Sequence, residues 1–210
     1  MKDLESLSSL QLDVLREIGN IGAGNAATAL AQMLNRKIEM SVPQVRIMQL
    51  EEILNLVGNE EDPVACINLA VFGSAPVRVL FLLPAGSAYM LIDLLLGQNF
   101  GATTTLGALE ESVLCEAGNI LTGSFLNAFA MMTQINFISS VPYLAFDMLG
   151  AVISSALVEG GCYSDQVLLI ETNFANEQGK INSHFFILPE ESSLEIILKA
   201  VGINCEEGVN

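Results

Sequence analysis

The fold is decided by residues 13–43, DVLREIGNIGAGNAATALAQMLNRKIEMSVP, because a second copy occurs at residues 112–142, SVLCEAGNILTGSFLNAFAMMTQINFISSVP. In this register of 99 residues, thirteen of thirty-one positions are identical, whereas about two would match by chance at ordinary amino-acid frequencies. The chain therefore contains one unit twice. A looser similarity of residues 81–84 (FLLP) to residues 186–189 (FILP), 105 positions later, predicts about six extra residues in the second copy, near 173–180.

Each copy has the pattern of a long helix, a strand through the Val-Pro, a short helical or loop segment, two more strands and a closing helix. Ser8 with Gln11 has the spacing of a capping box, and Glu110 with Glu111 places negative charge in the first turn of the second long helix. The alternation of Ile38, Met40 and Val42 predicts the first strand. The other elements are predicted as a hairpin of 64–72 with 77–83, a helix over 85–96, strands over 166–171 and 181–188, and a helix over 194–201.

Helices alternating with short strands, in a duplicated chain, predict an α/β or α+β fold with pseudo-two-fold symmetry. We expect two long surface helices over a shared, mainly antiparallel sheet. No Pro, Gly or Ser linker separates the halves. Residues 1–210 are therefore predicted to form a single domain, with repeat one at about 8–98 and repeat two at about 106–203.

Composition excludes several classes of function. A net charge of −16 would repel a phosphate backbone, so nucleic acid and anionic membrane surfaces are disfavoured as partners. Residues 117–146 carry no charge, but polar side chains and Pro142 interrupt them, so no membrane insertion is expected. The N-terminus lacks a secretory pattern and the four cysteines form no CxxC pair, which predicts a cytoplasmic protein without a metal site.

A polar stripe follows one face of each long helix. At 100° per residue, Asp13, Glu17, Asn20 and Gly24 fall on one line, which Ala31 continues. The second helix repeats the stripe with Ser112, Glu116, Asn119, Gly123 and Ala130. The opposite arc, expected to face the core, contains Leu15, Ile18, Gly22, Ala26, Ala29 and Met33, together with Asn25, which fits it poorly. Any solvated helix face has a similar spacing, and shared ancestry alone could preserve it.

The stripe can position a reactant but has no nucleophile of its own. The only histidine, His184, lies in an apolar strand-like run, which favours a structural role over a catalytic triad. Paired-carboxylate glycosidase chemistry is disfavoured because Ser112 replaces Asp13 in the second copy. An amide can hold a water molecule and a carboxylate can hold an ammonium group. Phosphoryl hydrolysis depends on such positioning.

These residues resemble the signature of the CheC family of chemotaxis phosphatases: Asp or Ser, three residues, Glu, two residues, Asn, twenty-two residues, Pro. Asp13, Glu17, Asn20 and Pro43 match it. The second match consists of Ser112, Glu116, Asn119 and Pro142. The resemblance extends over essentially the whole chain and implies a CheC-like domain.

The resemblance implies dephosphorylation of phosphorylated CheY, the chemotaxis response regulator. Asn20 and Asn119 would orient the attacking water, and Glu17 and Glu116 would pair with the regulator's active-site lysine. The resemblance also places four residues at the contact with CheY and two in shaping the next strand. The contact residues are Asp13, Ser112, Gly24 and Gly123, and the strand residues are Pro43 and Pro142. The chain would have no cofactor of its own, and Mg²⁺ would belong to the regulator.

Family members also bind the receptor deamidase CheD, and the resemblance places that contact around Asp147, Met148 and Leu149, within DMLGAVISS at residues 147–155. Two alternatives stay open. The chain is a non-catalytic module that binds response regulators or CheD, or it is the middle domain of a flagellar switch protein. The latter is disfavoured because those proteins carry a further C-terminal domain, whereas this sequence ends at Asn210.

Overall fold

The computed structural model describes residues 9–34, 37, 39–41, 44–159, 166–176, 179–190 and 193–200. The order of helices and strands follows the prediction except at one place: between the long helix and the short helix, each copy has two short strands where one strand was predicted. Both long helices have 26 residues. The elements are α1 (Ser9–Leu34), β1 (Glu39–Ser41), β2 (Val45–Gln49), α2 (Glu52–Val57), β3 (Pro63–Gly73), β4 (Val77–Pro84), α3 (Ala85–Leu96), α4 (Ala108–Thr133), β5 (Phe137–Ser139), β6 (Tyr143–Met148), α5 (Leu149–Glu159), β7 (Gln166–Asn176), β8 (Gly179–Pro189) and α6 (Ser193–Ala200).

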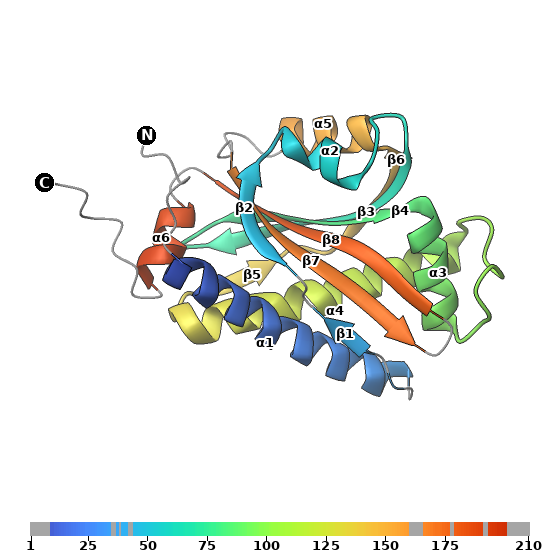
Figure 1. Cartoon of the computed structure of the whole chain (residues 1–210), viewed down its shortest axis with the longest axis horizontal. Helices are drawn as coiled ribbons and strands as arrows, with labels where there is room; N and C mark the ends of the chain where they lie inside the picture. The colour runs from blue at the N-terminus through green and yellow to red at the C-terminus, as the bar shows by residue number, and fades with distance from the viewer. Residues whose placement is uncertain are drawn as a thin grey trace, which may run out of the picture.

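One eight-stranded sheet contains strands from both copies, in the order β1-β7-β8-β4-β3-β5, with β2 also paired to β7 and β6 to β3. Every one of these pairs is antiparallel. The two long helices α1 and α4 pack against each other on one face, and α2 and α5 lie on the other (Figure 1). The predicted arrangement of long helices over a shared antiparallel sheet is confirmed.

The strand registers reveal a pseudo-two-fold axis between β4 and β8. Phe81 lies directly opposite Phe185, 104 residues later, and both face the long helices. Phe186, which the sequence similarity aligned with Phe81, packs on the other face of the sheet. The predicted register of 105 is therefore wrong by one residue, because successive strand residues point to opposite faces.

The positions of the extra residues also differ from the prediction. In β3 and β7, Ile67 matches Ile170 on the helix-covered face and Cys66 matches Leu169 on the other, a register of 103. The long helices keep the register of 99. Most of the extra length therefore enters between β6 and β7, and one residue enters in the turn between β7 and β8. The prediction of about six extra residues near 173–180 was wrong, because β7 and β8 remain paired through Asn176 and Gly179.

The remaining element predictions agree closely. The hairpin of β3 and β4, the helix α3 and the helix α6 lie where expected, while β7 extends beyond the predicted end at 171. Glu110 and Glu111 lie in the first turn of α4, where the Glu110 carboxylate accepts a hydrogen bond from the Gly107 backbone N–H. The capping pair predicted at Ser8 and Gln11 cannot be placed, because Ser8 lies outside the described residues.

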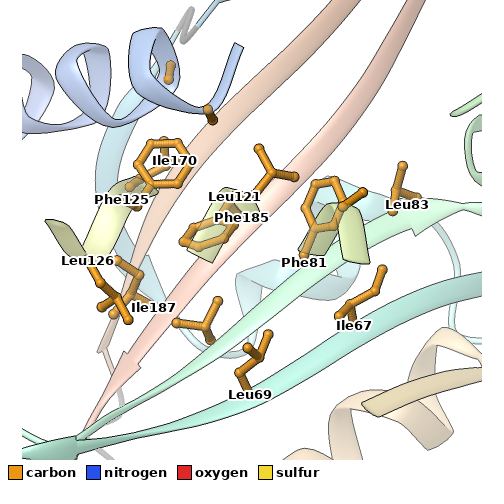
Figure 2. Close-up of a cluster of buried hydrophobic side chains, with 14 of the residues drawn as sticks. Ile67, Leu69, Phe81, Leu83, Leu121, Phe125, Leu126, Ile170, Phe185 and Ile187 are labelled. Atoms are coloured by element: carbon orange, nitrogen blue, oxygen red, sulfur yellow. The ribbon is translucent and has the colours of Figure 1, made fainter. Parts of the chain in front are cut away.

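Aromatic rings fill the layer between the long helices and the sheet. Phe125 of α4 lies against Phe185 of β8, with ring centroids 4.7 Å apart, and Phe81 lies 6.4 Å from Phe185 (Figure 2). Burial of several large apolar side chains, at about 1.5–3 kcal/mol each, is the main force that holds α4 on the sheet. The two helices are thereby fixed as supports for whatever their outer faces carry.

A buried carboxylate anchors the segment that joins the two copies. Asp93, on α3, is fully buried. Its oxygens accept hydrogen bonds from the backbone N–H groups of Gly101, Ala102 and Thr103, at 2.7, 3.2 and 2.9 Å. These bonds compensate the cost of burying the charge. The connection into α4 is therefore held in one conformation.

Among the described residues, no helix is both long and apolar enough to cross a bilayer.

Candidate functional site

The polar stripe of α1 faces outward. Asp13, Glu17, Asn20 and Gly24 are all exposed. Most of the opposite arc is in the core, because Leu15, Ile18, Gly22 and Ala26 are buried and Ala29 is half-buried. Periodicity therefore assigned the two faces of this helix correctly at these positions.

Two positions on the apolar arc of α1 depart from the prediction. Met33 is 46% exposed, so its assignment to the core was wrong. Met33 lies in the last turn of α1, where the described part of the chain leaves nearly half of its side chain uncovered. Asn25, the poor fit on that arc, is exposed as its polarity requires.

The stripe of α4 has the same orientation. Ser112, Glu116 and Asn119 are exposed and Gly123 is half-buried. The residues behind them are buried against the sheet and α1, and they are Leu114, Ala117, Gly118, Leu121, Phe125 and Ala128. The pairs Glu17 with Asn20 and Glu116 with Asn119 define site one and site two, respectively.

The polar side chains of both sites lie exposed on the two long helices. Glu17, Asn20, Glu116 and Asn119 make no side-chain hydrogen bond or ion pair to any described residue. A free exposed carboxylate can accept an ammonium group, and a free exposed amide can both donate and accept. The two sites are therefore prepared for contacts that only another molecule supplies.

Glycines separate into two kinds along the helices. A Cβ atom at Gly22 would overlap the Phe125 ring, and one at Gly118 would lie 2.5 Å from Ile67 Cγ2, so both glycines are needed for packing. A Cβ atom at Gly24 or Gly123 would meet nothing within 4 Å. Packing within the described residues therefore gives no reason for these two stripe glycines.

One feature of site one was missed by the sequence analysis. Arg16 donates from Nη1 to Asp13 Oδ1 at 2.9 Å, and the two side chains are 52% and 63% exposed. Their separation of three residues on a helix was a sufficient signal for this ion pair. The equivalent positions of site two are Ser112 and Cys115. Burial, followed by the nearby Glu111 carboxylate, raises the pKa of the Cys115 thiol.

The motif prolines lie after the long helices. Pro142 is half-buried and immediately precedes β6. Just before it, Ser140 donates its N–H to the Ala70 carbonyl at 2.8 Å, and Ser140 Oγ accepts from the Ala70 N–H at 3.0 Å. This position fits a role in shaping the strand. Pro43 lies outside the described residues.

The three residues proposed for the CheD contact differ in exposure. Asp147 and Met148 are exposed at the end of β6, whereas Leu149, at the start of α5, is fully buried. Leu149 therefore belongs to the core cluster beneath α5 and is not a surface contact. The outward face of α5 is exposed at Ala151, Ser154, Ser155 and Val158.

His184 lies far from both stripes, on the sheet face opposite the long helices. Its ring stacks on Phe186 with centroids 6.1 Å apart, and Glu171 is its cross-strand neighbour. Burial lowers the pKa of His184, against the opposing effect of Glu171. The structural role predicted for His184 agrees with this position. Within the described ranges, no three His, Cys, Asp or Glu side chains form a group suited to a metal ion.

Comparison with known sequences follows the two copies. A family model for the CheC-like family matches residues 10–47 and 109–144, which contain all but the first residue of each long helix and both motifs. The chain is 36% identical over 206 residues to the CheY-P phosphatase CheC of Bacillus subtilis (strain 168), covering 96% of this chain and 99% of that protein. It is 29% identical over 123 residues to the flagellar motor switch phosphatase FliY of the same organism, covering 58% of this chain and 32% of FliY.

Solved structures share the fold. The crystal structure of Thermotoga maritima FliY superposes with a TM-score of 0.73 at 20% identity, covering 93% of this chain and 98% of that one. The FliM middle domain of H. pylori gives a TM-score of 0.68 at 13% identity, covering 92% and 99%. The fold likeness agrees with the 36% identity to CheC over nearly the full length of both proteins, and the chain belongs to the CheC-like family.

Proposed function

We propose that this chain is a phosphatase that hydrolyses the aspartyl phosphate of CheY, using one site on each long helix. The observation that carries the proposal is the paired presentation of Glu17 with Asn20 and of Glu116 with Asn119 on exposed helix faces. The 36% identity to a CheY-P phosphatase over nearly the full chain supports the choice of substrate.

The chemistry proposed for each site is positioning. Asn20 or Asn119 accepts a hydrogen bond from a water molecule and directs it at the phosphorus atom, in line with the departing aspartate oxygen. Glu17 or Glu116 pairs with a lysine of the regulator and fixes the helix in register. Alignment of a nucleophile can contribute several kcal/mol, up to about 7–11 in ideal cases. The phosphorylated regulator is the substrate, and both the phosphoryl group and the Mg²⁺ belong to it.

The decisive experiment removes both amides. The Asn20→Ala/Asn119→Ala double variant should lose accelerated release of phosphate from phosphorylated CheY while keeping its far-UV circular dichroism. The matched control is Asn25→Ala/Asn127→Ala, which removes two exposed helix amides outside sites one and two and should keep wild-type turnover. Unchanged acceleration in the first double variant would show that the two amides are not the catalytic groups. A wild type that binds CheY without accelerating phosphate release would be the non-catalytic binding module.

Equivalence of the two sites is a separate question. If the sites are independent and equal, Glu17→Ala/Asn20→Ala and Glu116→Ala/Asn119→Ala each retain about half of the activity. A strongly unequal pair of rates at fixed salt would assign the reaction mainly to one helix.

We also infer that CheD binds the surface made by Asp147, Met148 and the outward face of α5. Val158 on that face is 85% exposed, and Met148 is 50% exposed. Met148→Lys/Val158→Lys should abolish co-elution with CheD and leave CheY-P hydrolysis unchanged. Retained co-elution would place the CheD contact elsewhere.

A further inference from the structure

The two sites differ in charged residues but not in the total charge at the differing positions. Site one is flanked by Asp13 and Arg16, which form an ion pair. Site two is flanked by Ser112 and Cys115 at the same places in the repeat. An acid and a base in one copy are therefore replaced together by two uncharged side chains in the other. In each copy, these two positions and the glutamate that follows them have the same net charge, and that charge comes from the glutamate alone.

The positions of Asp13 and Arg16 on α1 explain why neutralisation of Asp13 matters. Asp13 is four residues before Glu17, and Arg16 is four residues before Asn20, so each pair lies on neighbouring turns of one face. Like charges at that spacing repel each other. An uncompensated Asp13 would also repel the phosphoryl group that Asn20 must approach. The Arg16 guanidinium, 2.9 Å from the Asp13 carboxylate, cancels that charge locally.

We propose that Arg16 is a positioning residue of site one, whose role is to neutralise Asp13 during docking of the anionic phosphorylated partner. The inference rests on the proposed phosphatase function and adds a specificity determinant to it. Site two reaches the same local charge with Ser112 and Cys115. The role of Arg16 is electrostatic, so a second charge change that removes Asp13 makes Arg16 dispensable.

The test isolates site one in an Asn119→Ala parent. At low salt, Arg16→Ala should raise the KM for phosphorylated CheY about threefold to tenfold, with kcat within about twofold, as expected for a charge at the edge of an interface. The effect should shrink at about 0.5 M salt because the screening length becomes short. Arg16→Lys should raise KM less than Arg16→Ala does, and Asp13→Ser/Arg16→Ala should have a lower KM than Arg16→Ala.

The mirror experiment uses site two in an Asn20→Ala parent. Ser112→Asp should raise KM at low salt, and Ser112→Asp/Cys115→Arg should restore it, because the second change recreates the pair of site one. These variants change exposed or half-exposed positions, so thermal unfolding should be close to that of the parent.

Two outcomes overturn the inference. An unchanged KM in Arg16→Ala at low salt shows that the charge of Asp13 does not affect docking. A double variant as impaired as Arg16→Ala shows that Arg16 acts by itself and not through Asp13. The same variants are titrated with CheY carrying beryllium fluoride as a phosphoryl mimic. If neither single-site parent shows turnover, the proposed function fails. The affinities of the variants for CheY carrying beryllium fluoride then decide the role of Arg16.

Discussion

Gly22 of α1 lies against Phe125 of α4 so closely that a Cβ atom at Gly22 would overlap the phenyl ring. The contact also involves the Phe125 backbone, since that Cβ atom would lie 3.0 Å from Phe125 Cα. Phe125 in turn packs on Phe185 of the sheet, as Figure 2 shows. The distance between the two site-bearing helices is therefore set by the absence of a side chain at one residue.

Gly22→Ala should destabilise the protein. The added methyl group must displace Phe125 or separate the helices, which costs about 1–3 kcal/mol, more than the gain of up to about 1 kcal/mol in helix propensity. Urea unfolding followed by circular dichroism measures the change. A variant as stable as the wild type would show that α1 and α4 are not packed at this distance.

Gly24→Ala provides the contrasting case two residues later. Open space surrounds its Cβ position, so the substitution should stabilise α1 by about 0.5–1 kcal/mol through helix propensity alone. If a partner approaches the polar stripe closely, the same methyl group should raise KM for phosphorylated CheY severalfold. Thermal unfolding and steady-state kinetics in the Asn119→Ala parent measure the two effects. An unchanged KM would place Gly24 outside the contact.

Sequence reasoning located the helices and their outer faces because helical periodicity is a local property. Leu15 and Ile18 were assigned to the core and are fully buried. Periodicity does not reveal where coverage by other elements stops, which is why Met33 was assigned wrongly. The ion pair of Asp13 with Arg16 was also local and could have been found by its spacing.

The strand register could not be obtained in the same way. The likeness of FLLP to FILP aligned Phe81 with Phe186, but the structure places Phe185 opposite Phe81 and on the same face. A shift of one residue turns a strand side chain from one face to the other, and both faces of these strands are apolar. Within FLLP and FILP, sequence alone therefore had no polar residue with which to fix the face.

The corrected register identifies a buried polar pair in the second copy. Thr172 and Ser183 are cross-strand neighbours on β7 and β8, and their hydroxyl oxygens are 2.6 Å apart. The matching positions of the first copy are Leu69 and Val79, both buried. Ser183 Oγ also donates to the Thr172 carbonyl at 3.0 Å, so both hydroxyl groups are satisfied inside the core.

Ser183→Val alone should cost about 1–3 kcal/mol, because it removes the acceptor at 2.6 Å and leaves the buried Thr172 hydroxyl with only a weak 3.5 Å contact. Thr172→Val/Ser183→Val should be less destabilised than Ser183→Val, since no buried hydroxyl group remains. Urea unfolding of the single and double variants forms a double-mutant cycle. Additive effects would contradict the coupling.

His184 should make stability depend on pH in a defined window. Burial lowers the pKa of His184, and Arg46 lowers it further, although the facing Glu171 acts in the opposite direction. The unfolded chain then takes up a proton at about pH 6.5, while the folded protein takes it up only at lower pH. Protons therefore favour the unfolded state, so stability is full above about pH 6.5 and falls as pH decreases through the window toward the lowered pKa.

The pH test uses the chain's own symmetry as its control. Leu80 occupies the position on β4 that corresponds to His184 under the register of 104, so His184→Leu places the side chain of the first copy in the second. Between pH 7.5 and pH 5.5, the urea midpoint of the wild type should fall more than that of His184→Leu. Both proteins contain the same carboxyl groups, so their contribution cancels in the comparison. If the urea midpoints of the two proteins fall equally, His184 takes up its proton as readily in the folded protein as in the unfolded chain. Burial between Phe186 and Leu82 would then have no effect on proton uptake by His184.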